Sequence, residues 1–143
     1  MIKLHPQLEK DSIVLGEFTL CTLLLIKDAN YPWFILLPNR ENTTELHQLE
    51  PANQQQFWAE SMYFSHCLEA CFKPDKLNIA ALGNVVPQLH VHHIVRYKSD
   101  ACWPSPVWGS VKATDYTKEQ IQIIKTTLNL WLKKNTEQAF QWI

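Results

Sequence analysis

The stretch QLHVHHIVR, which runs from Gln88 to Arg96, decides both the fold and the site. A β-strand sends alternate side chains to opposite faces, so a strand here would place Gln88, His90 and His92 on one face. Polar groups inside a scaffold each need a partner, whereas a site that handles an anion could use all three. Imidazole suits nucleophilic or acid–base chemistry near neutral pH. We therefore predict a strand that carries a reactive face.

The adjacent His93 falls on the other face of this strand, with Val91 and Val95. There we expect a structural histidine at the rim of a helix-covered side. A metal site built from His90, His92 and His93 is the least favoured reading, because neighbouring side chains of a strand diverge.

The rest of the chain predicts further strands and two long helices. Apolar and β-branched residues indicate strands at 20–26, 33–37, 77–82 and 88–97. Pro51 is placed to begin a helix that Pro74 ends, and Thr117 with Gln120 forms a capping-box pattern ahead of a helix over about 117–135. This order predicts an α+β fold, with an antiparallel sheet of about five strands and two main helices.

Bulk composition restricts the class of protein. The 143 residues suit one domain, 1–143, and 46% of them are hydrophobic against 19% charged. The net charge of −1 gives no electrostatic reason to expect nucleic acid or a membrane surface as a partner. We see no apolar signal-peptide core and no membrane span, and we expect a cytoplasmic protein.

The four cysteines are Cys21, Cys67, Cys71 and Cys102. Cys67 and Cys71 stand four apart on one expected helix face, a spacing that could serve a metal. No full ligand set is visible, and we expect the thiols to pack as small apolar groups in a reducing compartment.

The motif resembles the histidine triad (HIT) family of nucleotide hydrolases and transferases, whose signature is His-φ-His-φ-His-φ-φ with φ apolar. Gln88 stands at the first histidine position and His93 at an apolar one. Three other stretches, about 28–40, 78–87 and 103–109, are similar to family segments, and the likeness covers about residues 5–110. The Gln-φ-His-φ-His form resembles a bacterial branch labelled diadenosine-tetraphosphate-hydrolase-like.

The resemblance implies a HIT-like fold, a homodimer and a catalytic set of His90, His92 and Gln88. His90 would attack the α-phosphorus of a nucleotide and form a covalent nucleotidyl-imidazole, which water then hydrolyses. His92 would donate to phosphate oxygens or to the bridging oxygen. Gln88 would orient His90 or a phosphate through its amide, which cannot carry a proton.

Other residues are expected to bind the substrate. Gly83 and Asn84 precede the motif and could offer N–H donors to phosphate. Asp28 and Asn30 sit where relatives contact ribose hydroxyls, and Asn78 could support the nucleophile loop. The expected substrate-binding residues are therefore Gly83, Asn84, Asn78, Asp28, Asn30 and, by stacking, Trp108.

The remaining alternatives concern Trp108, Arg96 and turnover. Trp108, in an aromatic loop with Trp103, could instead pack against a second subunit, and Arg96 could meet a distal phosphate or be solvated. No metal ligand and no required cofactor is predicted, although Mg²⁺ could accompany a polyphosphate substrate. A nucleotide-binding module with weak or no turnover is the alternative to an enzyme. The sequence does not choose among dinucleoside polyphosphates, phosphoramidates and nucleotide sugars.

Overall fold

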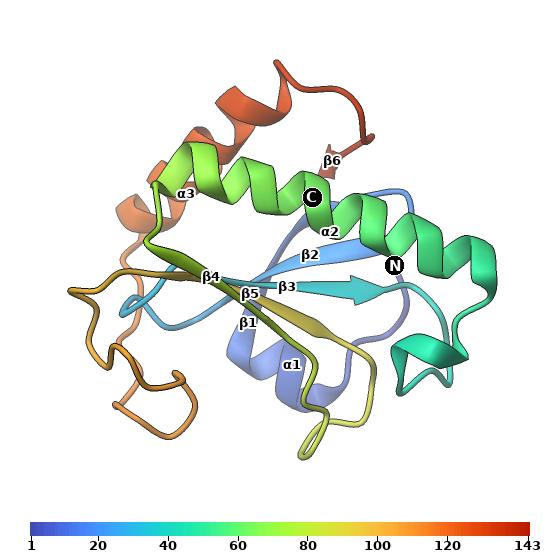
Figure 1. The fold of residues 1–143 in the computed structure, drawn as a ribbon, viewed down its shortest axis with the longest axis horizontal. Helices are drawn as coiled ribbons and strands as arrows, with labels where there is room; N and C mark the ends of the chain where they lie inside the picture. Colours follow the sequence, from blue (N-terminus) through green and yellow to red (C-terminus); the bar gives the residue numbers. More distant parts are fainter.

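The computed structural model describes residues 1–143 and has an α+β fold built on one antiparallel six-stranded sheet (Figure 1). The strands lie in the order β4-β5-β3-β2-β1-β6, so the motif strand β5 is inside the sheet. Their bounds are Ser12–Glu17 for β1, Cys21–Ile26 for β2, Trp33–Pro38 for β3, Lys76–Ala80 for β4, Val91–Arg96 for β5 and Gln141–Trp142 for β6.

Three α-helices cover the sheet: α1 (Pro6–Asp11), α2 (Pro51–Phe72) and α3 (Lys118–Leu132); a short 3-10 helix, η1 (Leu46–Gln48), precedes α2. Figure 1 shows α2 and α3 on one face and α1 on the other. The predicted starts of the two long helices are confirmed. Pro51 occupies the first turn of α2, and Thr117 and Gln120 exchange both bonds of a capping box at α3.

Side chains alternate across the sheet and divide the core into parts. The larger cluster lies under α2 and α3 and includes Phe34 and Val95. A smaller cluster on the opposite face joins Ile35 to Leu8 of α1. Because His92 pairs with Ile35 in the register of β5 and β3, it lies on the α1 face.

The α+β prediction is confirmed, and the sheet has six strands where about five were expected. The four strand ranges and two long helices located in the sequence leave out α1, β1 and β6. The predicted strand 88–97 is also shorter, because β3 and β4 pair with β5 only from Val91 onward. Gln88 therefore lies on a bend before the strand, and the prediction that it shares a strand face with His92 is wrong.

The C-terminal segment completes the sheet by pairing β6 with β1. Gly16 makes this approach feasible: a Cβ there would lie 2.3 Å from the Gln141 carbonyl oxygen and 2.5 Å from the Phe140 ring. A glycine is thus required where two strands approach closely. None of the helices combines the length and apolar character needed to cross a bilayer.

Candidate active site

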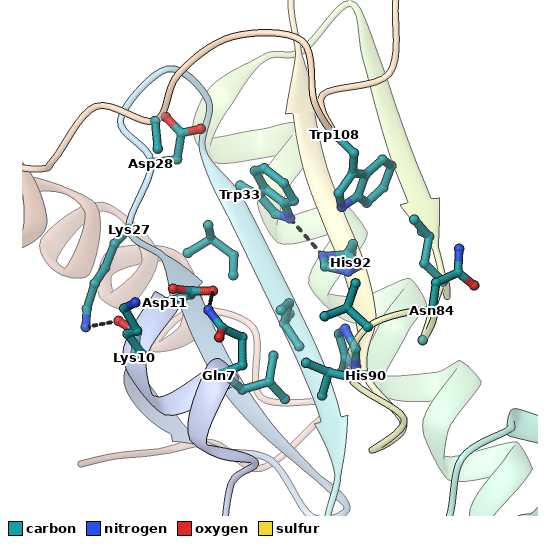
Figure 2. A pocket seen from close by; sticks show the side chains of 18 of the residues that line it. Gln7, Lys10, Asp11, Lys27, Asp28, Trp33, Asn84, His90, His92 and Trp108 are labelled. Atoms are coloured by element: carbon teal, nitrogen blue, oxygen red, sulfur yellow. Dashed lines mark hydrogen bonds between the residues drawn. The ribbon is translucent and has the colours of Figure 1, made fainter.

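A cavity of about 700 Å³ opens on the α1 face of the sheet, where the motif enters β5. Helix α1 supplies one wall through Gln7 and Leu8, and Ile35 of β3 lies at its floor. Figure 2 shows His90, His92, Asn84 and Trp108 on one side of this cavity, and Lys10, Lys27 and Asp28 on the other.

His90 lines the cavity and is 7% exposed. Its Nδ1 lies 2.6 Å from the main-chain oxygen of Gln88, and a carbonyl oxygen can only accept, so Nδ1 carries the proton. In the neutral ring, Nε2 then holds a lone pair, and it makes no hydrogen bond within the protein. Burial lowers the pKa of His90, and the nearby charge of His5 lowers it further. The hydrogen bond to the Gln88 oxygen raises this pKa but does not outweigh burial. His90 is therefore a neutral imidazole with a free nucleophilic nitrogen.

His92 has the complementary arrangement. Its Nδ1 accepts a hydrogen bond of 2.9 Å from Nε1 of Trp33, so the proton of the neutral ring lies on Nε2. Burial, aided by the charges of His90 and His93, lowers the pKa of His92 to about 3. The ring centroids of His90 and His92 are 5.0 Å apart. One nucleophilic nitrogen and one N–H donor thus lie side by side in the cavity.

His93 faces α2 and is fully buried, as the strand alternation predicted. Its Nδ1 lies 3.2 Å from the oxygen of Val91 and its Nε2 lies 2.8 Å from Oγ of Ser61. Both ring nitrogens are therefore occupied, and burial lowers the pKa of His93 to about 4. This histidine has no nitrogen left for a ligand.

The Gln88 side chain does not reach His90. Its Oε1 accepts from the His5 main-chain N–H at 2.8 Å, and its Nε2 donates to the Lys3 oxygen at 3.0 Å. The amide therefore holds the segment before α1 through one accepted and one donated main-chain hydrogen bond, as a neighbouring strand would. The expected contact between the Gln88 amide and His90 is absent; only the main-chain oxygen of Gln88 orients the nucleophile.

Asp28 and Asn30 take different positions. Asp28 lines the cavity, and its Oδ1 accepts from the Asn30 main chain, the Asn30 amide and the Thr114 main chain, while Oδ2 makes no hydrogen bond. Asn30 does not line the cavity; its amide also donates to the oxygen of Lys112. The structure thus gives Asn30 a supporting place behind Asp28 and leaves one carboxylate oxygen for a ligand.

Gly83, Asn84 and Trp108 all line the cavity, whereas Asn78 does not. Gly83 has φ +70°, a conformation that favours glycine. The ring of Trp108 lies 5.1 Å from that of His92. Asn78 accepts from Arg96 at 2.8 Å on the far part of β5, so its expected contact with the nucleophile loop is absent.

Arg96 is neither solvated nor available to phosphate, contrary to both expectations. It is 1% exposed and forms an ion pair of 2.7 Å with Asp100. Its guanidinium also donates to the Ser105 oxygen and lies 5.5 Å from the Trp103 ring. Arg96 therefore stabilises the loop after β5. This loop contains Trp108, which lines the cavity.

No group of three or more histidine, cysteine, aspartate or glutamate side chains is arranged to hold a metal ion. The four cysteines are free, and Sγ of Cys67 lies 3.9 Å from Sγ of Cys71. The polar groups that line the cavity are histidine, amide, carboxylate and lysine side chains.

Comparison with known proteins identifies this arrangement. A family model described as HIT domain matches residues 7–99, which include both pocket histidines. The chain belongs to the HIT domain family. The HIT region therefore begins in α1 and ends just after β5. No curated protein matches the sequence.

Solved structures of histidine triad proteins resemble this HIT chain over nearly their full length. The protein from Marinobacter aquaeolei VT8 is 44% identical with a TM-score of 0.89, over 94% of this chain and 98% of that one. The protein from Bradyrhizobium japonicum is 44% identical with a TM-score of 0.88, over 90% and 96%. A Sulfolobus tokodaii structure, titled a hypothetical histidine triad nucleotide-binding protein, is 16% identical with a TM-score of 0.62 over 83% and 85%, and shows the fold alone.

Sequence reasoning missed several residues of the HIT pocket. Gln7 and Leu8 belong to α1, a six-residue helix whose one clear signal is Pro6 in its first turn. The sequence predicts that Trp33 lies on a strand, but its bond to His92 depends on the pairing of β3 with β5. The position of Trp33 at the start of a strand after a turn carried no sign of that partner.

Proposed function

We propose that this HIT protein is a nucleotide hydrolase or nucleotidyl transferase that cleaves at the α-phosphate through a covalent nucleotidyl-His90 intermediate. The complementary protonation of the two pocket imidazoles carries the proposal. His90 offers the Nε2 lone pair because its Nδ1 is bonded to Gln88, and His92 offers an Nε2–H because its Nδ1 is bonded to Trp33. A nucleophile beside a fixed donor is what displacement at phosphorus needs.

The reaction would proceed in two displacements. His90 Nε2 forms a P–N bond to the α-phosphorus while the bond to the leaving group breaks, and the leaving group takes the electron pair. His92 Nε2–H stabilises a phosphate oxygen or the bridging atom by a hydrogen bond. Water then attacks the phosphorus, the P–N bond breaks, its electron pair returns to His90, and the proton from water passes to solvent. Another acceptor in place of water would make the enzyme a transferase.

The nucleoside would occupy the part of the cavity between α1 and the sheet. Leu8, Ile26 and Ile35 give this part apolar walls that suit a base. Asp28 would accept from ribose hydroxyls through Oδ2, which has no hydrogen bond within the protein. Gly83 and Asn84 also line the cavity, and Figure 2 shows Asn84 on the same side as the histidines, where the phosphates would lie.

The charge around the cavity bears on polyphosphate substrates. Of its lining residues, Lys10 and Lys27 are the cations, and Figure 2 shows both across the cavity from His92. Lys27 Nζ already donates to the Lys10 oxygen at 2.7 Å. Arg96 is paired with Asp100 and does not reach the cavity. Because few cations face the phosphates, we expect a polyphosphate to bind with Mg²⁺ as part of the substrate and not as a resident cofactor.

A hydrolysis panel tests the proposal. We would assay dinucleoside polyphosphates such as diadenosine tetraphosphate, adenosine phosphoramidates and nucleotide sugars with wild type beside His90→Ala. We expect nucleoside monophosphate from at least one group, and a loss of about 10³-fold or more in His90→Ala with binding retained. Binding without turnover by wild type would support the alternative, a nucleotide-binding module.

We also infer the finer assignments that the motif form and surface suggest. The Gln-φ-His-φ-His motif supports the bacterial diadenosine-tetraphosphate-hydrolase-like branch. The outer edge of β4 has no partner strand, and exposed apolar Ile79 on β4 and Trp58 and Met62 on α2 support a homodimer. Four free thiols are in keeping with a reducing compartment such as the cytoplasm.

A further inference from the structure

Trp33 donates a hydrogen bond to His92 in which donor and acceptor cannot be exchanged. The bond from Trp33 Nε1 to His92 Nδ1 is 2.9 Å long, and the two side chains are 8% and 6% exposed. The indole N–H is a donor and never an acceptor. His92 Nδ1 must therefore stay unprotonated while this bond exists, and the single proton of the ring stays on Nε2.

The surroundings of His92 give it no second proton. The rings paired with it are those of Trp33, Trp108 and His90, and His90 already directs its Nδ1 proton to the Gln88 oxygen. Neighbouring His93 points to the opposite face. Across the cavity lie Lys10, Lys27, Asp11, Asp28 and Asp115, and no carboxylate is bonded to His92. The low pKa of His92, about 3, follows from the same burial.

A neutral imidazole with one proton can donate a hydrogen bond, but it cannot release that proton without becoming a highly basic imidazolate. We propose that Trp33 is a positioning residue that keeps His92 a hydrogen-bond donor and so restricts this enzyme to leaving groups that depart as stable anions. The phosphate chain of a nucleoside polyphosphate is such a group. The amine of a phosphoramidate is not, because it must gain a proton to leave. The inference rests on the proposed function and names its substrate class.

The first displacement balances without proton transfer for a polyphosphate. His90 Nε2 forms the P–N bond, the P–O bond breaks, and the oxygen departs with the electron pair as a phosphate anion that the His92 N–H stabilises. For an amine, the P–N bond to the leaving group breaks in the same way, but the nitrogen requires one proton. His92 held by Trp33 has none to spare.

Nitrogen NMR of the imidazole rings tests the geometry apart from activity. In ¹⁵N-histidine-labelled wild type, we expect His92 to be neutral between about pH 5 and 8, with a pyridine-like Nδ1 and a protonated Nε2. In Trp33→Phe the donor is lost, and the protonation midpoint of His92 should rise. An imidazolium, or a protonated Nδ1, at His92 in wild type near pH 7 would overturn the inference.

A leaving-group series tests the consequence. We would compare diadenosine tetraphosphate with an adenosine 5′-phosphoramidate of a primary amine, and then aryl esters of AMP whose phenols span about six pKa units. For wild type we expect the polyphosphate to react at least about 100-fold faster by kcat/KM, and a steep fall with phenol pKa. In Trp33→His, the new imidazole can both accept and carry a proton. This variant should lower the polyphosphate-to-phosphoramidate ratio of kcat/KM at least about tenfold and weaken the dependence of kcat/KM on phenol pKa.

Trp33→Phe serves where Trp33→His fails to fold, because it keeps a ring against Tyr31 and Trp108. Trp142→Phe, which removes an indole N–H donated to Asn129 at 2.9 Å and does not line the cavity, is the matched control and should leave the ratio unchanged. Equal wild-type rates for amine and phosphate leaving groups, or unchanged ratios in both folded Trp33 variants, would overturn the inference alone. Absence of hydrolysis and of any His90 adduct with every substrate would overturn the proposed function, and this inference with it.

Discussion

His92 and His93 are adjacent in sequence and both buried, yet only His92 keeps a ring nitrogen for a ligand. On the α1 face, Trp33 occupies Nδ1 of His92 and leaves Nε2 at the cavity. On the helix face, Val91 and Ser61 occupy both nitrogens of His93. Burial alone does not separate a reactive histidine from a structural one, since it lowers the pKa of each. The number of nitrogens left unbonded does separate them.

The largest expected contrast is in turnover. His92→Ala removes the donor beside the phosphate and should lower kcat by about 10²-fold or more, in the range of one lost donor in a preorganised site. His93→Val removes no group from the cavity and should keep at least about a third of wild-type kcat. Steady-state assays with the best substrate of the panel measure both. A more severe loss in His93→Val would show that the two faces have been assigned the wrong way round.

Acid should destabilise the protein through both histidines. The folded pKa values, about 3 for His92 and about 4 for His93, lie below the unfolded value of about 6.5. The unfolded chain therefore binds more protons than the folded protein when the pH is below about 6.5. The stabilisation is complete above about pH 6.5 and is lost as the pH falls toward the folded pKa values, by roughly 2 kcal/mol for each ring at about pH 5. Urea denaturation across this range measures the loss. A free energy of unfolding that does not change between about pH 7 and 5 would contradict the assignment.

The variant His93→Val should reverse its effect with pH. Near pH 7 it leaves the buried Ser61 hydroxyl without its partner and should lower the free energy of unfolding by about 1 kcal/mol. Near pH 5 valine has no proton to gain, so the variant should become more stable than wild type, by about 1 kcal/mol. Parallel denaturation curves at both pH values, with no crossing, would show that His93 does not titrate on unfolding.

A smaller effect is expected from Gln88→Ala. The change removes two hydrogen bonds that hold the segment before α1, but it keeps the main-chain oxygen that orients His90. KM should rise by about three- to tenfold, because α1 forms a wall of the cavity, while kcat stays within about twofold. Hydrogen exchange of residues 2–8 should quicken in the variant. Gln88→His should behave similarly, since the donor and acceptor nitrogens of an imidazole do not have the spacing and direction of the amide oxygen and amino group that now bond the two main-chain groups.

The motif strand could be predicted because its information is local. Alternation along β5 separates His92 from His93 in any sheet, and the helix starts at Pro51 and Thr117 follow from capping chemistry. These features depend on residues within a few positions of each other.

The missed features depend on contacts between distant segments. The amide of Gln88 is used by main-chain groups 83 and 85 residues away, and Trp33 meets His92 only through the pairing of β3 with β5. The two-residue strand β6 forms because Gly16 admits it, which the isolated sequence QW does not signal. Residue type predicted that the Gln88 amide would be bonded, but the expected contact with His90 is replaced by bonds to the main chain of His5 and Lys3.

Trapping the covalent intermediate tests the central claim most directly. Wild type would be mixed with a labelled nucleotide substrate, quenched within one turnover at alkaline pH to preserve the acid-labile P–N bond, and digested for mass spectrometry. We expect one nucleoside monophosphate group on His90, absent from His90→Ala and retained in His93→Val. A label on another residue, or product formed in a single turnover with no adduct on His90, would contradict the account.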